Sequence, residues 1–432
     1  MDYLKASKKI LINYYENVEQ NLKLILQTEL RKQIHENTSK ITNIVYGVVR
    51  KEKVLDYIIS QVSNTKIKKI MINNLILLRI GLFIIFFADS TPNYAIVNEI
   101  VKLTKNKTKK FINAILRTSI RKKTKIIEDT NKLKLEIKYS ISKELIHNLK
   151  FLSEDIEPFL KYLNKKPIFH LLENTFNTEK NSNKRQKMLK HLKLISPLKT
   201  YELEKPKAFI STLIKDGSCY IQNTGSQIIS IISAHFSRNR VLDCCAAPGT
   251  KSITLKNLRP NLKIIANDIH FDRINLLKKT NITDIDIMVS DISVPSCKNV
   301  FDLLIVDAPC SSSGTLRKNP DLKTKITETF INNNVEKQKH ILQSIFENFS
   351  NIYVLYAVCS FIKNETEDIL DYIITKNKSK CSIKIIELSD ILNKYQFEFQ
   401  KGKHGYYLLP SNNLNNDMFY ISLISLTPLD QI

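Results

Sequence analysis

Apolar residues in the first 125 positions recur with the spacing of one face of an α-helix. Three groups carry the pattern: Leu11, Tyr14, Tyr15, Val18 and Leu22; Ile44, Val45, Val48 and Val49; and Leu55, Ile58 and Ile59. No strand-like alternation of apolar and polar residues interrupts it. The sequence therefore predicts an all-helical domain at the amino-terminal side, which we assign to residues 1–128.

Apolar runs of strand length dominate after residue 213 and alternate with helical stretches. The expected strands cover residues 240–244, 263–267, 285–290, 301–306, 352–358, 382–388 and 419–426. The expected helices begin near Ser252, surround 273–279, and cover 327–348 and 365–374. Long helices between apolar strands are typical of a parallel sheet that is covered on both faces. We therefore predict a doubly wound α/β domain for residues 213–432.

The region between these two, residues 129–212, shows no single periodicity. Residues 164–167 and the polar run 177–187 have the composition of loops between short elements. We expect a small α+β module or a structured linker that joins the helical domain to the α/β domain.

The net charge of the chain indicates what kind of partner it could bind. The 432 residues include 66 Lys and Arg against 42 Asp and Glu, a formal net charge of +24. Such an excess favours a polyanionic partner such as nucleic acid. Basic residues cluster at 66–69, 102–110 and 117–123, and any single cluster is better explained as a solvated face or loop. Together they are expected to contact phosphates and position RNA without reading its sequence.

Seven cysteines are odd in number and lack paired metal-ligand spacing; they stand at positions 219, 244, 245, 297, 310, 359 and 381. This usage indicates reduced thiols, with neither a disulfide framework nor a zinc site. The first five residues lack the layout of a signal peptide, and the most apolar run, Ile80–Ala88, is too short to span a bilayer. We expect a cytoplasmic monomer that binds no metal and no membrane.

Two of the cysteines stand at the carboxyl ends of expected strands. Cys310 follows the run that ends in Val306 and Asp307, and Cys359 follows the run 354–358. Because open α/β sheets place their ligand crevice at this end of the strands, both thiols are expected to face one crevice. A thiol pair beside a carboxylate suits addition of a nucleophile to one carbon and later loss of a proton from its neighbour. A buried structural role is the alternative for either cysteine.

The turn after strand 240–244 has the features of a cofactor loop. Its small residues let the backbone approach a ligand, and a helix amino terminus with unpaired N–H groups follows. Asp268 and Asp291 end the next two strands, where the first can accept both ribose hydroxyls and the second can reach the adenine. S-adenosylmethionine fits better than a dinucleotide, because the glycine-rich pyrophosphate turn is absent. The expected cofactor-binding residues are Cys245, Ala246, Ala247, Pro248, Gly249, Thr250, Lys251, Asp268, Asp291 and Asp307.

A polar loop continues from Asp307 to Asp321. A loop of this composition can wrap the edge of a flat substrate. We expect Arg317 and Lys318 to hold phosphates next to that substrate.

The helical region resembles the NusB-like RNA-binding domain that is fused to some RNA methyltransferases. The order and spacing of four stretches carry the resemblance: Tyr46–Arg50, Leu78–Leu82, Pro92–Glu99 and Phe111–Arg117. The α/β region resembles the RsmB/Sun/Fmu group of RNA cytosine-5 methyltransferases, the NOL1/NOP2/Sun family. The matching residues are Cys245–Lys251, Asp268, Asp291, Asp307–Ser311 and Tyr356–Ser360.

The resemblance implies a three-part fold: an all-α NusB-like domain, a small α+β middle module and a Rossmann-like domain dependent on S-adenosylmethionine. It also implies methylation of carbon 5 of one cytosine in small-subunit (16S) ribosomal RNA, of the position-967 class. Two alternatives stay open. The chain could be a non-catalytic assembly factor that binds ribosomal RNA, or a methyltransferase that acts on transfer RNA.

By the same resemblance, Cys359 is the nucleophile that adds to carbon 6 of the base. Asp307 stabilises the charge that develops near ring nitrogen 3 and the exocyclic amine, and Cys310 assists proton loss from carbon 5 and release of the enzyme. DNA cytosine methyltransferases use the cysteine of a Pro-Cys motif instead, which would make Cys310 the nucleophile.

Three positions of the α/β region depart from the family pattern. Thr250 stands where a second glycine is usual, Val358 replaces the threonine that commonly precedes the nucleophile, and Met418 replaces a glycine after Asp417. In the middle module, the usual Leu-Arg-Val-Asn is reduced to Leu171–Asn174. None of these changes removes a reacting group.

Overall fold

The computed structural model divides into two compact units. One unit contains Met1–His147, Asp155–Asn164 and Leu316–Ile326, and the other contains Asn148–Glu154, Lys165–Thr315 and Thr327–Ile432. The structure describes residues 2–17, 20–32, 37–88, 92–175, 187, 189–190, 192–196, 198–203, 208–277, 284–294 and 299–429.

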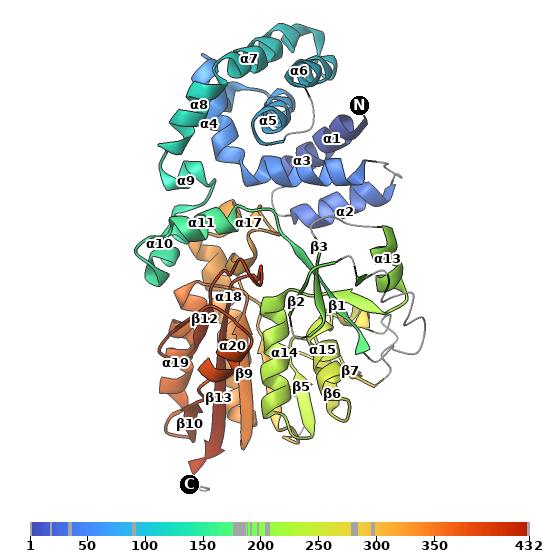
Figure 1. Cartoon of the computed structure of the whole chain (residues 1–432). Coiled ribbons are helices and arrows are strands. Elements are labelled where there is room, and N and C mark those ends of the chain that lie inside the picture. The colour runs from blue at the N-terminus through green and yellow to red at the C-terminus, as the bar shows by residue number, and fades with distance from the viewer. Residues whose placement is uncertain are drawn as a thin grey trace. The chain divides into compact units, whose positions relative to one another are not determined.

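The first unit is built of helices, as the apolar periodicity predicted (Figure 1). Its longer helices are α1 (Asp2–Glu16), α2 (Leu22–Lys32), α3 (Thr38–Arg50), α4 (Glu52–Val62), α5 (Ile72–Phe87), α6 (Asn93–Lys102), α7 (Lys109–Arg121) and α8 (Lys123–Asn131). Shorter helices follow: α9 (Leu135–Lys138), α10 (Lys143–Leu152), which runs on into the second unit, and α11 (Glu157–Leu163).

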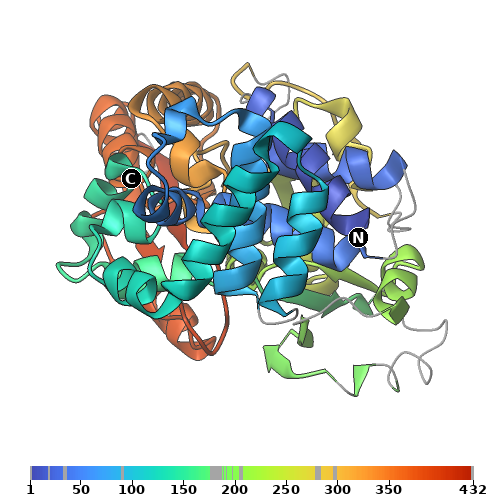
Figure 2. The ribbon, with the colours of Figure 1, turned by 90° about the horizontal axis from the view of Figure 1, so that it is seen from above.

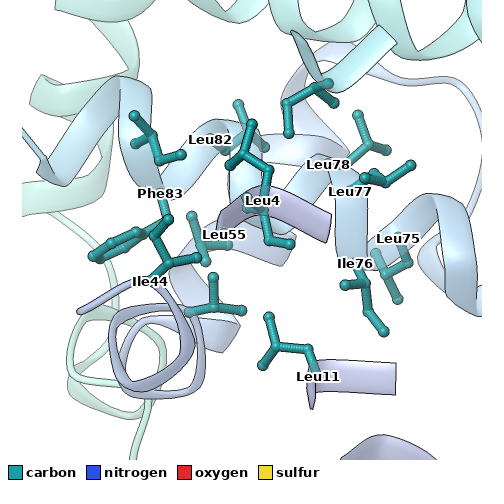
Figure 3. Close-up of a cluster of buried hydrophobic side chains, with 14 of the residues drawn as sticks. Leu4, Leu11, Ile44, Leu55, Leu75, Ile76, Leu77, Leu78, Leu82 and Phe83 are labelled. Atoms are coloured by element: carbon teal, nitrogen blue, oxygen red, sulfur yellow. The ribbon is translucent and has the colours of Figure 1, made fainter. Parts of the chain in front are cut away.

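Helix α5 is apolar on all sides and forms the centre of this unit. Every residue from Asn74 to Ile85 is buried, as expected of a helix without a polar face. Seen from above, α5, α6 and α7 lie side by side (Figure 2). Leu4 and Leu11 of α1, Ile44 of α3 and Leu55 of α4 point towards the α5 side chains (Figure 3).

Residues Leu316–Ile326, which follow the Cys310 loop in sequence, belong to the helical unit. They include the short helix α17 (Leu322–Lys325). Lys323 Nζ is buried and donates to Asn164 Oδ1 at 2.7 Å and to the Arg50 carbonyl at 3.3 Å. Backbone carbonyls and an amide oxygen thus surround this ammonium group, which ties the segment to the helices.

The expectation that Arg317 holds substrate phosphates is wrong. Its side chain is 2 % exposed, lies over the Tyr162 ring and donates to the Tyr162 hydroxyl at 2.5 Å. Lys318 is half-buried. The Arg317 guanidinium is therefore a packing element of the helical unit.

The second unit contains a small antiparallel sheet in the order β2-β3-β1-β4, with α13 (Ala208–Lys215) next to β4 in sequence. Its strands are β1 (Phe169–Glu173), β2 (Leu194–Ser196), β3 (Thr200–Leu203) and β4 (Cys219–Ile221). Together with α9, α10 and α11, this sheet and helix account for the mixed pattern of the middle region. Residues 177–186 of its polar run lie outside the described residues.

A nine-stranded sheet forms the rest of this unit, in the order β11-β12-β13-β9-β8-β5-β6-β7, with β10 also paired to β13. The neighbours β9, β8, β5, β6 and β7 are parallel, whereas β10, β12 and β9 pair antiparallel with β13. Its strands are β5 (Arg240–Asp243), β6 (Lys263–Asn267), β7 (Asp286–Met288), β8 (Leu303–Asp307), β9 (Ile352–Val358), β10 (Cys381–Ile385), β11 (Phe399–Lys401), β12 (Tyr406–Leu408) and β13 (Phe419–Pro428).

The prediction of a wholly parallel sheet is therefore correct for only one half of it. Short connections join β11, β12 and β13, and connections too short for a crossover helix produce antiparallel neighbours. In Figure 1, α14 (Thr224–Phe236) and α15 (Thr250–Leu258) lie in front of the strands. Further helices in this part are α16 (Phe271–Ile274), α18 (Glu328–Asn348), α19 (Glu367–Asn377) and α20 (Ser389–Lys394). Throughout the described part of the chain, no helix has the length and apolar character needed to cross a membrane.

Candidate active site

The two cysteine-bearing strands are neighbours in the parallel half of the large sheet. Asp307, the last residue of β8, lies opposite Ala357 of β9, and the Ala308 N–H donates to the Ala357 carbonyl at 3.0 Å. Because both strands run in the same direction, the segments that follow them leave the sheet at the same edge. The sulfur atoms of Cys310 and Cys359 lie 3.4 Å apart, which confirms that they face one another.

A buried carboxylate, Glu365, joins the two cysteine segments. It accepts from the Ser311 N–H and from the Ser311 and Ser360 hydroxyls, each at 2.6 Å. Ser311 follows Cys310 and Ser360 follows Cys359, so one side chain fixes the spacing of the residues next to both sulfurs. Glu365 is 0 % exposed, and its burial raises the pKa of its carboxyl group despite the donors around it.

The two thiols do not have equal surroundings. A hydrogen bond with Cys359 raises the pKa of Cys310 well above its usual range, and burial and the nearby Glu365 charge act in the same direction. The Ser312 N–H opposes them to a smaller extent. Cys310 therefore holds its proton more tightly than an ordinary thiol does.

Lys251 and Asp307 form an ion pair beside the cysteines. Burial disfavours the charge of Lys251, but Asp307 and the nearby Asp243 outweigh burial and raise the pKa of Lys251. The ammonium group is therefore a fixed positive charge. Since Lys251 is on α15 and Asp307 ends β8, the pair connects the cofactor loop to the cysteine strands.

The expected cofactor loop, residues 244–249, runs from β5 to the start of α15. Gly249 adopts φ +99°, a region that side chains rarely allow, and a Cβ there would lie 2.5 Å from Leu277 Cδ1. The Ala247 N–H donates to Asp268 Oδ2 at 3.1 Å. Glycine and Asp268 together hold the loop backbone close to the first turn of α15, where helical N–H groups are left for a ligand.

Asn267, at the end of β6, connects the ends of three neighbouring strands. Its amide group donates to the Cys244 and Ser290 carbonyls at 3.1 Å, and its oxygen accepts from the Ser290 N–H at 3.0 Å. Asp268 is buried, with Oδ1 accepting from the His270 N–H at 3.0 Å. Asp291 is exposed and accepts from the N–H and hydroxyl of Ser293 at 2.9 and 2.7 Å.

These residues fit S-adenosylmethionine. A carboxylate oxygen has two lone pairs, so Asp268 can accept from ribose hydroxyls in addition to its backbone donors. Cys245 belongs to the loop, and burial together with the charges of Asp243, Asp307 and Asp268 raises the pKa of its thiol, which keeps it neutral. Within the described ranges, no group of three or more His, Cys, Asp or Glu side chains could hold a metal ion.

A cavity of about 170 Å³ lies elsewhere, between β1 and α15. Its lining includes Leu172, Glu173, Tyr220 and Asn257, and none of the expected site residues. This cavity therefore contains none of the proposed reacting groups.

Asp243, the last residue of β5, is a completely buried carboxyl group. Ser252 Oγ donates to its Oδ2 at 2.6 Å, while for Oδ1 no hydrogen-bond partner is found among the described residues. Burial raises the pKa of Asp243 to about 6, although Lys251 and Ser252 act against this change and Asp307 and Asp268 add to it. The folded protein therefore binds the Asp243 proton more tightly than the unfolded chain does.

We expect Asp243→Asn to be more stable than the parent protein at pH 8, by roughly 1–3 kcal/mol, and to lose that advantage at pH 4. A raised pKa contributes stability below the unfolded value near 3.8, and this contribution is lost as the pH rises through about 6. Asparagine keeps an acceptor for Ser252 and does not titrate. Urea unfolding at pH 4 to 8, followed by circular dichroism, measures the difference in the free energy of unfolding between the two proteins. A difference that is the same at every pH would contradict the raised pKa of Asp243.

Three residues of this site were not found from the sequence. Asn267 and Asp243 lie at or near the ends of the expected strands 263–267 and 240–244, and a polar residue at the end of an apolar run was the available signal. Glu365 was expected to begin a helix, where a carboxylate has a capping role. Gly314 lets two backbone segments lie close together. A Cβ at this position would lie 2.0 Å from the Met418 carbonyl oxygen, so only glycine allows residue 314 to pack against Met418.

Residues 231–425 match the family described as 16S rRNA methyltransferase RsmB/F, and residues 5–121 match the NusB family. The fold, the cofactor loop and these matches define the α/β region as a methyltransferase of the Rossmann-like class. More narrowly, the α/β region belongs to the RsmB/F methyltransferase family, of the NOL1/NOP2/Sun group, and a NusB-family domain precedes it in the chain. The family resemblance is confirmed.

Similar proteins agree with this assignment. A probable ribosomal RNA small subunit methyltransferase B of Coxiella burnetii (strain RSA 493 / Nine Mile phase I) is 27 % identical over 448 residues, which cover 98 % of this chain and 99 % of that protein. A 28S rRNA (cytosine-C(5))-methyltransferase of Mus musculus is 30 % identical over 171 residues, 37 % of this chain and 22 % of that protein. The crystal structure of PH0851 has the same fold, with a TM-score of 0.72, 20 % identity and coverage of 98 % of this chain and 97 % of that one.

Proposed function

We propose that this methyltransferase uses S-adenosylmethionine to methylate carbon 5 of a cytosine in small-subunit ribosomal RNA. The observation that carries the proposal is the pair of sulfur atoms 3.4 Å apart at the ends of adjacent parallel strands. The names of the relatives support the substrate: the Coxiella protein is named for the small ribosomal subunit, and the mouse protein for carbon 5 of cytosine. We also propose that the target cytosine is of the position-967 class, and this part of the proposal rests on the family resemblance alone.

S-adenosylmethionine, when bound, supplies a methyl group on a positively charged sulfur. The backbone of residues 245–250 and the first turn of α15 would hold it, with Asp268 at the ribose and Asp291 at the adenine. Lys251 and Asp307 lie between this loop and the cysteines. The target base must leave its helix or come from a single strand to reach these groups.

The first step is addition of the Cys359 thiolate to carbon 6 of cytosine. Carbon 5 of the free base is a poor nucleophile, and a new S–C6 bond makes it enamine-like, so that it can take the methyl group. Negative charge develops on the ring during the addition. The Asp307 carboxylate can accept from the exocyclic amine, and the Lys251 ammonium offsets the charge from a fixed position.

The second step is elimination. The proton on carbon 5 leaves to water, the S–C6 bond breaks, and its electron pair returns to the Cys359 sulfur. We assign Cys310 to this step, because it keeps its proton and lies 3.4 Å from that sulfur. Its S–H can donate to the departing thiolate while the proton on carbon 5 is lost.

Methyl transfer to purified RNA tests the proposal. We expect tritium from methyl-labelled S-adenosylmethionine in small-subunit ribosomal RNA, and bisulfite sequencing should place it on one cytosine. Transfer RNA in the same assay is expected to remain unlabelled. Labelling of transfer RNA alone would overturn the substrate assignment, whereas the absence of labelling in any RNA and of cofactor binding by calorimetry would favour a non-catalytic assembly factor.

A further inference from the structure

Ser312 contacts the sulfur atoms of both cysteines. The Cys359 thiol donates to Ser312 Oγ at 3.4 Å, and the Ser312 N–H forms a hydrogen bond with the Cys310 sulfur. A hydroxyl group donates as well as accepts, so Ser312 Oγ–H can turn towards the Cys359 sulfur once its proton has left. We propose that Ser312 is a further catalytic residue, which stabilises the thiolate of Cys359; this inference rests on the proposed function.

The backbone at Ser312 is held in a conformation that its side chain does not favour. Its φ is +57°, in the left-handed region. Such a residue persists where its surroundings impose the conformation, and it often lies at a functional site. Here the N–H and hydroxyl of Thr315 both donate to the Ser312 carbonyl, at 2.9 and 2.8 Å. The geometry turns the Ser312 hydroxyl towards the sulfur of Cys359.

The residues on either side hold this segment against the Cys359 strand. Ser311 is fixed by two hydrogen bonds to Glu365, and the Gly314 N–H donates to the Cys359 carbonyl at 3.0 Å. Ser312 cannot move away from Cys359 without breaking one of these contacts. Its hydroxyl is therefore in place before substrate binds, and such preorganisation is the property that makes a dipole effective in catalysis.

The neighbouring hydroxyl groups have other partners. Ser311 and Ser360 donate to Glu365, and Ser313 Oγ pairs with Ser360 Oγ at 2.9 Å. Val358, which precedes Cys359, is buried and apolar. The titratable groups around Cys359 are Cys310 and Lys251, with Asp307 and Glu365 behind them. Because the Lys251 charge also favours a thiolate, loss of Ser312 Oγ should weaken the nucleophile without abolishing it.

Ser312→Gly tests the role of the hydroxyl, since glycine adopts φ +57° without strain. We expect iodoacetamide to alkylate Cys359 about tenfold more slowly at pH 7.5 in this variant, the effect of losing one hydrogen bond to a charged group. Mass spectrometry of the Cys359 peptide follows the rate in the full chain. In methyl transfer, kcat should fall about tenfold with KM for RNA unchanged. Alkylation at the parent rate would overturn the inference.

Two further variants separate the effect of the missing hydroxyl from the effect of a changed backbone conformation. Ser312→Ala also lacks the hydroxyl but keeps the Cβ, so it should slow alkylation as much as Ser312→Gly does. If Ser312→Ala slowed alkylation and Ser312→Gly did not, backbone strain would be the cause and the proposal would be contradicted. Ser140→Gly makes the same change at another left-handed serine, φ +50°, in the helical unit, and should leave alkylation unchanged. Neither RNA nor cofactor enters the alkylation assay. Failure of the proposed function would therefore appear as absent methyl transfer while the alkylation difference remained.

Discussion

Replacement of Cys359 by alanine is expected to reduce methyl transfer to RNA by roughly 10³-fold or more, because the proposed covalent mechanism loses its nucleophile. The residue directly follows β9, in which every residue except Tyr353 is buried, and a change from sulfur to hydrogen at its Cβ leaves the strand register unchanged. Cofactor binding should survive, since the loop proposed to hold the cofactor follows a different strand, β5. Initial rates with labelled S-adenosylmethionine, together with calorimetry for the cofactor, measure both effects.

Cys381→Ala is the matched control for Cys359→Ala. Cys381 begins β10 and is a buried thiol of the same unit, and it does not contact the paired cysteines. This variant should retain the parent turnover. Full turnover by Cys359→Ala would contradict the proposed covalent mechanism.

Replacement of Cys310 by alanine has a different expected result, the accumulation of a stable protein–RNA adduct. Addition through Cys359 can still occur, but the S–H that assists departure of the thiolate is missing, so elimination becomes slow. Turnover should fall by roughly 10²-fold or more, the usual size of a lost proton-transfer group. A band of reduced mobility in a denaturing gel, dependent on both RNA and cofactor, reports the adduct.

The double variant Cys310→Ala with Cys359→Ala provides the control, because it should form no adduct. The opposite pattern, in which Cys359→Ala accumulates the adduct and Cys310→Ala does not, would assign the nucleophile to the Pro-Cys segment. That is the arrangement of the DNA enzymes. The raised pKa of Cys310 argues against it, since a thiol that keeps its proton is a weak nucleophile.

The strands of the parallel half could be predicted because each contains an apolar run, and β5, β6 and β8 end in a polar residue. In the antiparallel half, β10 and β13 were also predicted, whereas β11 and β12 were not, since they are three-residue strands that leave no period in the sequence. The membership of Leu316–Ile326 in the helical unit also escaped prediction. Buried Lys and Arg side chains resemble a solvated loop in sequence, and only contacts with residues far along the chain reveal their burial.

The candidate site likewise has a part that could be predicted from the sequence and a part that could not. The closeness of Cys310 and Cys359 followed from strand order, because the carboxyl ends of neighbouring parallel strands meet at one edge. The groups that orient these sulfurs, Glu365 and Ser312, have no local signature. Each owes its position to hydrogen bonds between segments about fifty residues apart, as the 54-residue separation of Ser311 and Glu365 illustrates.

The contribution of Leu316–Ile326 to the helical unit bears on how the protein is made. Synthesis on the ribosome releases a chain from its amino terminus, and a domain usually folds as soon as its last residue emerges. Here the helices are complete long before residue 326 appears, yet the unit lacks a buried segment until then. Its final closure must wait until about three quarters of the 432 residues have been translated.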